Sequence, residues 1–356
     1  MKFDLDEFAL ELARPLETAH GAITHREGFL VRIEADGIEG VGEATPLPGW
    51  TESIDECRDA LDHASSVSES DGFDAGLDAV MPSCPAARHG LSLALSDIRA
   101  REAGQPLYRY LGGRACSSVP VNATIGDGSV EETVTAAERA VDHGYECLKC
   151  KIGVQSVDTD VERLRAVRNA VGDIELRGDA NGAWNRAQAI RAFEAFSDIG
   201  ISYVEQPLSP DAVEGHATLR KQAREIGGGD RVGVALDETL TQTSIDSVVS
   251  DGVADVLVLK PMAIGGVDRT REIAVMAREA GMTPVVTTTI DGAYARSGTV
   301  HVAASIPDIP ACGLATGDRL ADDFVPDPVP VDEGRITVPQ GNGNGNMPRE
   351  SNGTDA

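Results

Sequence analysis

The clearest pattern in the chain is a series of short apolar runs that recur from residue 119 onward. Their starts are about two to three dozen residues apart, and most intervals carry an amphipathic helical pattern such as "SVEETVTAAERAVDHG". The runs are "VPVNATI", "YECLKCK", "IELRGDA", "ISYVEQP", "VGVALDE", "ADVLVLKP", "TPVVTTT" and "PACGLAT". Strands that alternate with helices in this way predict a (β/α) barrel over residues 119–318.

The segments on either side of this series read differently. Residues 1–118 combine strand-like "GFLVRIEADGIEGVGEA" with helical "AARHGLSLALSDIRAREAG", which indicates a separate α+β domain. Residues 319–340 are expected to pack back on that first domain. The end of the chain, "PQGNGNGNMPRESNGTDA", is rich in Gly and Asn, so a disordered tail is predicted over residues 341–356.

The net charge of the chain excludes some classes of function. The chain of 356 residues has 58 acidic residues, a net charge of -27 and five lysines. Such a field repels nucleic acid and anionic membranes, and no stretch approaches the length of a membrane span. The start has no apolar signal core, so a cytoplasmic location is expected. Excess acid with little lysine favours a halophilic source, with an ordinary acidic protein as the alternative.

The six cysteines do not form a compact disulfide framework. Cys147 and Cys150 have the CxxC spacing, which occurs in metal and redox sites. On a strand, however, these two side chains point to opposite faces and cannot grip one ion. A structural role for both is therefore predicted.

Ionisable residues stand at the carboxyl ends of the predicted barrel strands, where barrel enzymes build their active sites. Three are carboxylates on consecutive strands, namely Asp179, Glu205 and Asp237. Carboxylate oxygens are the preferred ligands of hard cations, and unpaired carboxylates closing apolar strands would be costly. The pattern predicts a divalent metal site.

Three of the five lysines lie on the same strand ends. Lys149 and Lys151 share one face of the second predicted strand, and Lys260 closes the sixth. A lysine that is partly desolvated beside another cation has a lowered pKa and can act as a general base. The alternative is that each lysine only pairs with a carboxylate. A catalytic role is favoured for Lys151 and Lys260, and both roles stay open for Lys149.

This constellation resembles the enolase superfamily, in particular its muconate-lactonizing subgroup, over nearly the whole chain. The resemblance implies a modified (β/α)7β barrel of the TIM type with an N-terminal α+β capping domain. It also implies that the three carboxylates bind Mg2+, with Mn2+ as a substitute, and that Lys151 and Lys260 face each other across the substrate. The family's shared step is removal of the proton α to a carboxylate. Lys149 and Asn181 are expected to support the catalytic lysines.

Branches of the superfamily differ at other strand ends. The seventh predicted strand ends in "TTTID" without the histidine of the mandelate-racemase branch, and "ACGLATGDRLADD" lacks the DxD of dipeptide epimerases. Three stretches, "GEATPLPGWTES", "VPVNATIGD" and "ACGLATGDRLADDF", resemble the o-succinylbenzoate synthases. That family dehydrates 2-succinyl-6-hydroxy-2,4-cyclohexadiene-1-carboxylate to 2-succinylbenzoate in menaquinone biosynthesis, and some members racemise N-succinylamino acids.

Several alternatives stay open. An N-succinylamino acid racemase or a muconate cycloisomerase-like enzyme would use the same residues. A Schiff-base aldolase built on Lys260, or a non-catalytic barrel, would leave the carboxylates unexplained. The expected partner is a small carboxylate, and a homo-oligomer is compatible with the sequence. Residues expected to contact substrate are Pro46, Leu47, Gly49, Trp50, Thr288 and Thr316.

Overall fold

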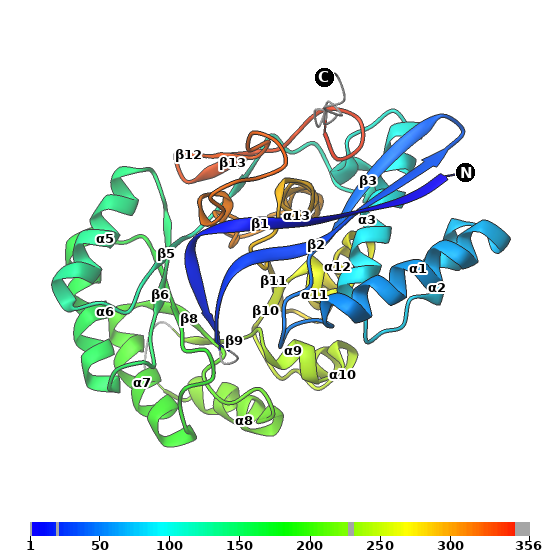
Figure 1. The fold of residues 1–356 in the computed structure, drawn as a ribbon. Helices are drawn as coiled ribbons and strands as arrows, with labels where there is room; N and C mark the ends of the chain where they lie inside the picture. Colours follow the sequence, from blue (N-terminus) through cyan, green and yellow to red (C-terminus); the bar gives the residue numbers. More distant parts are fainter. Residues whose placement is uncertain (1, 19–20, 227–230, 346–356) are drawn as a thin grey trace.

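The computed structural model describes residues 2–18, 21–226 and 231–345. The chain begins with an antiparallel sheet of three strands, β1 (Lys2–Thr18), β2 (Gly21–Ala35) and β3 (Ile38–Ala44). Four helices follow, α1 (Ile54–Asp71), α2 (Phe73–Ala79), α3 (Pro85–Glu102) and α4 (Leu107–Tyr110). Buried residues of β2 and α3, such as Phe29 and Leu91, form the core between sheet and helices. This is the α+β capping domain, drawn in blue and cyan in Figure 1.

A parallel sheet of seven strands forms the second part of the molecule. Its strands, in chain order, are β5 (Ala123–Ile125), β6 (Cys147–Lys151), β7 (Glu175–Asp179), β8 (Ile201–Glu205), β9 (Gly233–Leu236), β10 (Val256–Leu259) and β11 (Thr283–Val286). They are hydrogen-bonded in that same order, so each strand lies beside its neighbour in sequence.

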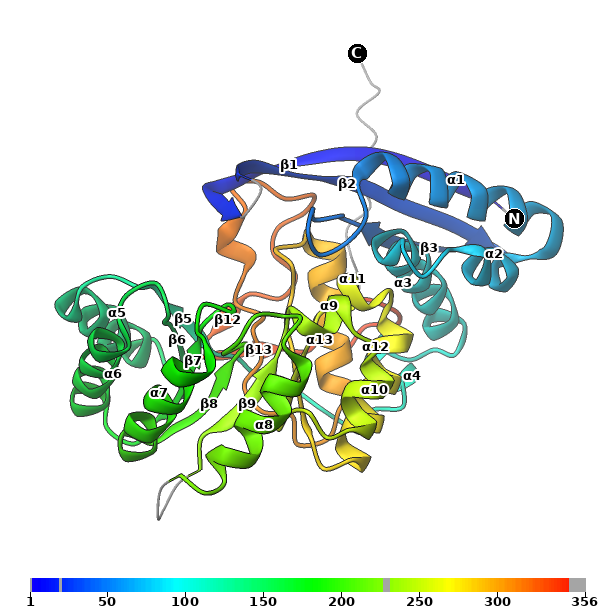
Figure 2. The same ribbon diagram turned by 90° about the horizontal axis from the view of Figure 1, so that it is seen from below.

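Helices connect successive strands of this sheet and cover its outside. They are α5 (Val130–Asp142), α6 (Val157–Val171), α7 (Arg186–Ile199), α8 (Val213–Ala223), α9 (Thr239–Gln242), α10 (Ile245–Ser250), α11 (Pro261–Ile264), α12 (Val267–Glu279) and α13 (Ala293–Ser305). Helices α5 and α7 begin at capping boxes built on Ser129 and Asn185, which satisfy free backbone N–H groups. Figure 2 shows these helices around the strands, with the β1–β3 sheet beside the barrel.

The eighth predicted strand, "PACGLAT", is not a regular strand. It makes isolated bridges instead, from Cys312 to Val121 and from Gly313 to Thr287. These two bridges join the segment to both edges of the seven-stranded sheet and close the ring. The structure therefore confirms the modified (β/α)7β barrel with an α+β cap, whereas the domain boundaries at residues 118 and 318 stay predictions.

The first predicted strand, "VPVNATI", is divided. Its second half is β5, but its first half is β4 (Ser118–Pro120), which pairs with β13 (Arg335–Thr337) in a separate small sheet completed by β12 (Val331–Asp332). A 3₁₀ turn at Gly317–Arg319 precedes this C-terminal segment. Just after the turn, Leu320 bridges Leu12 of β1, so the start of this segment lies against the cap.

The prediction of disorder from residue 341 is wrong for residues 341–345. Asn344 is only 1% exposed, and its backbone N–H donates to Asp97 Oδ1 at 2.7 Å. Gly343 accepts a hydrogen bond from the backbone N–H of Leu107 at 2.7 Å. Composition missed this packing because backbone and amide groups make it, without large apolar side chains. The rest of the predicted tail, residues 346–356, lies outside the described residues.

Two further expectations concern cysteines and membranes. Cys147 and Cys150 lie on β6 as buried free thiols. Burial raises the pKa of both thiols, that of Cys150 to about 12. Within the described ranges, none of the helices has the length and apolar character needed to cross a membrane.

Candidate active site

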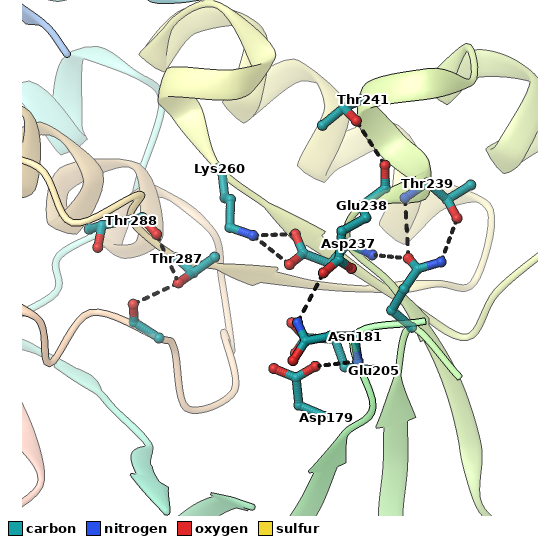
Figure 3. Close-up of polar contacts among 12 residues, drawn as sticks. Asp179, Asn181, Glu205, Asp237, Glu238, Thr239, Thr241, Lys260, Thr287 and Thr288 are labelled. Carbon is teal, nitrogen blue, oxygen red and sulfur yellow. Dashed lines mark hydrogen bonds and ion pairs between the residues drawn. The ribbon is translucent and has the colours of Figure 1, made fainter. Parts of the chain in front are cut away.

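The predicted catalytic and metal-binding residues meet at one rim of the barrel. Asp179 and Glu205 are the last residues of β7 and β8, Asp237 follows β9, and Lys260 follows β10. Parallel strands end at the same side of a barrel, so this spacing in sequence becomes proximity in space. Lys149 and Lys151 alternate with buried residues on the neighbouring strand β6. Figure 3 shows the three carboxylates and Lys260 side by side.

Strand order arranges these side chains as a row. Along the rim the order is Lys151, Asp179, Glu205, Asp237, Lys260, because β6, β7, β8, β9 and β10 are consecutive in the sheet. The carboxylates are buried, with exposed fractions of 1%, 2% and 4% in that order. The two lysines with predicted catalytic roles therefore stand at opposite ends of a row of three buried carboxylates.

Each carboxylate of the row is paired with a lysine. Lys149 Nζ lies 3.1 Å from Glu205 Oε2 and 3.3 Å from Asp179 Oδ2. Lys260 Nζ donates to both oxygens of Asp237, at 2.6 Å for Oδ1. Buried charges of this kind need such partners, because desolvation without pairing is costly.

Lys151 has a different surrounding from Lys149. Its Nζ donates to Asp179 Oδ2 at 2.8 Å and to Asn181 Oδ1 at 2.6 Å. Its side chain is 36% exposed, compared with 16% for Lys149 and 12% for Lys260. Lys151 is thus the lysine of the rim most open to a substrate, whereas Lys149 is held between two carboxylates.

The buried charges of the row shift the pKa values of its members. Burial and the neighbouring charge of Asp179 raise the pKa of Glu205 to about 7. Burial also opposes ionisation of Asp179, but Lys149 and Lys151 outweigh it and lower that pKa to about 2. Burial likewise works against the charged form of Lys149, yet the carboxylates outweigh it and raise its pKa well above the usual value. Lys149 is therefore held as a cation, which suits a supporting role.

The donor set fits a hard divalent cation, although the side chains are not gathered around one. Among the residues that the structure describes, no group of three His, Cys, Asp or Glu side chains has the spacing of a metal cluster. The carboxylates instead face lysines, and burial together with the charge of Asp179 raises the pKa of Glu205 despite its ion pair with Lys149. A cation at Asp179, Glu205 and Asp237 would supply positive charge and would compete with the lysines for the same oxygens.

The capping domain places an aromatic ring on this row. The Nζ atom of Lys260 lies 3.5 Å from the centroid of the Trp50 ring, within cation–π range. Trp50 follows a tight turn in which its N–H donates to Leu47 O at 2.9 Å, and Gly49 takes a φ of 88° that favours glycine. Of the four predicted cap-loop residues, Trp50 is thus brought to the rim, with Leu47, Gly49 and Pro46 forming the loop that carries it.

Buried Arg26 on β2 fastens the same loop to the barrel. Its guanidinium donates to the carbonyl oxygens of Thr45 at 2.9 Å, Pro46 at 3.0 Å and Ile290 at 3.1 Å. Ile290 lies beyond the end of β11, so this one side chain joins the cap loop to a barrel loop. No local pattern around Arg26 indicates this role, because its partners lie up to 264 positions away.

Two predicted substrate contacts meet on the other side of the rim. The hydroxyl oxygens of Thr288 and Thr316 are 2.8 Å apart, which joins the loop after β11 to the end of the Cys312–Gly313 segment. The site at this position presents hydroxyl groups from both threonines.

Two polar residues of the rim were not predicted. Gln206 is fully buried with a φ of 42°, and its Oε1 accepts from the N–H groups of Asp237 and Thr239. Glu238 Oε1 accepts from Asn181 Nδ2 at 3.0 Å. Each comes directly after a predicted metal carboxylate, in "VEQP" and "ALDET", and this adjacency is the signal that could have identified them.

Comparison with known proteins adds family information to this geometry. The family model described as "Enolase C-terminal domain-like" matches residues 132–352. The model of the mandelate racemase / muconate lactonizing enzyme N-terminal domain matches residues 6–112. A similar relative is the L-Ala-D/L-Glu epimerase of Bacillus subtilis, 28% identical over 86% of this chain and 85% of that protein.

Solved structures give the same picture. A dipeptide epimerase from Methylococcus capsulatus, complexed with Mg and the dipeptide L-Arg-D-Lys, is 28% identical with a TM-score of 0.83, covering 97% of this chain and 98% of that one. An N-succinyl Arg/Lys racemase from Bacillus cereus is 25% identical with a TM-score of 0.82, covering 97% and 95%. Similarity at this level extends over both the cap and the barrel.

Proposed function

Because the chain belongs to the mandelate racemase and muconate lactonizing enzyme family of the enolase superfamily, we propose that it removes the α-proton of a small carboxylate substrate. The observation that carries this proposal is the row at the barrel rim. Lys151 and Lys260 stand at its two ends, with buried carboxylates between them. A substrate over the row would meet an amine at either end, as proton transfer at a carbon atom requires.

The proposal includes a divalent cation, with Mg2+ as the natural choice. Asp179, Glu205 and Asp237 would hold it through carboxylate oxygens, which Mg2+ prefers. The related epimerase from Methylococcus capsulatus was crystallised with Mg, which supports this assignment. When bound, the ion supplies positive charge that stabilises negative charge developing on the substrate carboxylate.

We place the substrate among carboxylates that carry a succinyl group, for which two reactions are candidates. The first is dehydration of 2-succinyl-6-hydroxy-2,4-cyclohexadiene-1-carboxylate to 2-succinylbenzoate, which would make the chain a lyase. It is supported by the cap-loop and eighth-segment sequences quoted above, and by an aromatic cap residue, Trp50, that suits a ring substrate. Here Lys151 would take the α-proton and return it to the departing hydroxyl, while Lys260 stays a cation.

The second reaction is racemisation of an N-succinylamino acid, and the comparisons favour it. The similar Bacillus cereus protein is an N-succinyl Arg/Lys racemase, and other relatives are epimerases. Lys151 and Lys260 would then act alternately, one removing the proton and the other returning it on the opposite face. A free dipeptide is less well served, because the eighth segment lacks the DxD motif that would hold an ammonium and carries Thr316, whose hydroxyl is hydrogen-bonded to that of Thr288.

The test is an assay of the purified chain with Mg2+ in concentrated KCl against three probes. The cyclohexadiene substrate is followed by the absorbance of the aromatic product, and an N-succinylamino acid and a dipeptide by deuterium incorporation from D2O. Turnover of either succinylated probe that EDTA abolishes is the expected result. Turnover of the dipeptide alone would overturn the substrate class, and full activity in excess EDTA would overturn the metal.

The two lysines can be distinguished in the same assay. Lys151→Ala should abolish dehydration and exchange at its face of the substrate, whereas Lys260→Ala should abolish dehydration and spare that exchange. Both variants should still bind Mg2+, because neither lysine is a proposed ligand. Wild-type dehydration by Lys151→Ala would show that this lysine is structural.

A further inference from the structure

The residue Glu238 is linked to Lys151 through one intervening side chain. Lys151 Nζ donates to Asn181 Oδ1 at 2.6 Å, and Asn181 Nδ2 donates to Glu238 Oε1 at 3.0 Å. Figure 3 shows Asn181 at the rim between Asp179 and Glu238. From this chain of contacts we infer that Glu238 is a positioning residue, which orients Asn181 and thereby aims the amine of Lys151 at the substrate. The inference rests on the proposed function, in which Lys151 is the base.

The amide of Asn181 is polar in a way that its neighbours can select. An asparagine side chain has a donor end and an acceptor end of nearly the same shape, so it can turn over unless its neighbours distinguish them. A carboxylate oxygen only accepts, so Glu238 selects the donor end of Asn181. The acceptor end is then turned toward Lys151, which only donates from its N–H groups.

The backbone of Asn181 strengthens this orientation. Its φ is 41°, in the left-handed region that asparagine tolerates better than most residues, and its N–H donates to Asp179 Oδ1 at 3.2 Å. The other oxygen of Asp179 accepts from Lys151 at 2.8 Å. Asp179 and Asn181 therefore form two acceptors held in fixed relation to each other.

The two acceptors also determine the geometry of the Lys151 amine. A neutral lysine amine has two N–H bonds and one lone pair in a tetrahedral arrangement. If Asp179 and Asn181 accept the two N–H bonds, the lone pair is left in the remaining direction and can receive a proton there. Asn181 is not a proposed metal ligand, so its Oδ1 stays available to Lys151 when a cation binds Asp179. Loss of this acceptor would let the amine rotate, and misplacement of a reacting group costs large factors in rate.

One buried oxygen of the half-exposed Glu238 side chain also suggests a role beyond stability. Its second carboxylate oxygen, Oε2, is buried and has no hydrogen-bond partner among the described residues. An unpaired buried oxygen is unfavourable, and such exceptions concentrate where function requires them. Within the described residues, the hydrogen bond of the Glu238 side chain to Asn181 is the one interaction that explains the orientation of this carboxylate.

The test compares Glu238→Leu, which removes the acceptor, with Glu238→Gln, which keeps one acceptor oxygen. Deuterium exchange is measured on the N-succinylamino acid of each configuration, and Lys151→Ala identifies the configuration that Lys151 serves. Glu238→Leu should slow exchange of that enantiomer by about tenfold or more through kcat, with KM nearly unchanged. The exchange rate of the other enantiomer, which Lys260 serves, should stay within about twofold of the wild-type rate. The exchange rate of Glu238→Gln at the Lys151 face should lie between those of wild type and Glu238→Leu.

A matched control distinguishes the loss of Lys151 positioning from a general disturbance of the local structure. Thr241→Val removes the hydroxyl that donates to the backbone oxygen of Glu238 at 2.9 Å, in the same turn, and should leave both exchange rates unchanged. Titration with Mg2+ should give the same affinity for wild type and all three variants. Equal losses for both enantiomers, or no loss with Glu238→Leu, would overturn the inference.

A second measurement is independent of the substrate. The chain has five lysines, so protein labelled with 15N-lysine gives few Nζ signals and each can be assigned by substitution. Glu238→Leu should shift the Lys151 signal and leave those of Lys221 and Lys260 in place. An unmoved Lys151 signal would overturn the inference, whereas a moved signal without any exchange in wild type would count against the proposed substrate and leave the positioning role standing.

Discussion

Glu205 is the residue at which the electrostatic argument for a metal is strongest. It is the middle carboxylate of the row, 2% exposed, and burial together with the charge of Asp179 raises its pKa to about 7. The ion pair with Lys149 offsets part of this cost. A divalent ion would offset more of it, so metal affinity should depend heavily on this side chain.

Glu205→Gln should therefore lower Mg2+ affinity by about a hundredfold or more, with a similar loss of activity at limiting metal, since a charged ligand is lost from a hard-cation site. Isothermal titration with Mg2+ measures the affinity directly. The control is Glu162→Gln, a change on the exposed side of α6, which should leave the affinity unaltered. Equal affinities for Glu205→Gln and wild type would remove Glu205 from the ligand set.

At this scale the sequence predicted the residues that strand periodicity places on the rim. Lys149, Lys151, Asp179 and Glu205 could be located because strand ends and face alternation are local properties. Arg26 could not, because its contact with Ile290 depends on how two domains meet.

Glu238 and Gln206 could not be predicted either, because their roles depend on hydrogen bonds between loops. The assignment of functions to all these residues stays a prediction.

At the scale of elements, the joint between β3 and α13 determines how the cap meets the barrel. Glu43, directly before the end of β3, is fully buried and accepts from the N–H groups of Gly292 and Ala295 at the start of α13, at 2.7 and 2.9 Å. The hydroxyl of Thr45 also donates to it at 2.6 Å. The carboxyl group of Glu43 accepts from free N–H groups at the start of α13 and so caps this helix.

The same burial makes this joint sensitive to pH. Burial and the neighbouring Asp291 raise the pKa of Glu43 from 4.5 to about 7, against the effect of its hydrogen bonds, and Arg26 and His89 are the other charged or titratable groups around it. Between these pH values the folded chain holds a proton that the unfolded chain has released. The contribution of Glu43 to the free energy of unfolding is therefore full below pH 4.5 and is lost as the pH rises to about 7.

Glu43→Gln should remove this component, so the stability of the variant should fall less than that of wild type across the same interval. Denaturant unfolding at several pH values measures the difference, with the exposed residue of the same domain, Glu27→Gln, as the matched control. Parallel pH profiles for wild type and Glu43→Gln would contradict the assignment.

The eighth barrel segment shows why elements were only partly predictable. Its apolar run indicated a strand. Instead, Cys312 makes one bridge, to Val121 at one edge of the sheet, and Gly313 makes one bridge, to Thr287 at the other edge. Ring closure positions this segment, and closure is a property of the whole barrel that no local pattern encodes.

At the scale of the whole molecule, residues 341–345 fasten the cap to the barrel. Asn344 receives a hydrogen bond from Ser297 of α13 at 2.9 Å, donates to Tyr294 O at 2.9 Å, and bonds Asp97 of α3 through its N–H. Gly343 fits here because a Cβ atom would lie 2.0 Å from Asp97 Oδ1. The composition of residues 341–345 predicted disorder because composition reflects apolar content and contains no information about specific hydrogen bonds.

Removal of residues 339–356 should therefore lower the melting temperature clearly, whereas removal of residues 346–356 should change it little. The first deletion leaves the carboxylate of Asp97 and the carbonyl of Tyr294 without these partners, and unpaired buried polar groups are costly. Thermal unfolding of the two shortened chains beside the full chain is the measurement. Equal melting temperatures for the two deletions would show that the segment contributes nothing to the joint.

Net charge is the remaining property of the whole molecule that affects stability. With a net charge of -27 and five lysines, the acidic residues repel one another in the folded chain more than in the expanded unfolded chain. Salt screens this repulsion, since the Debye length falls from about 10 Å at 0.1 M to about 3 Å at 1 M.

The melting temperature should accordingly rise as KCl is increased from about 0.1 M to molar levels, steeply at first and then more slowly as screening saturates. Sucrose, which strengthens burial without screening charge, is the control, and its effect should lack the steep initial part. Replacing exposed acidic residues such as Glu27 and Glu162 by glutamine in one variant should weaken the response to KCl, because fewer repulsions remain to be screened. A melting temperature that is flat or falls with KCl would show that self-repulsion does not limit this fold, and would favour an ordinary acidic protein over a halophilic one.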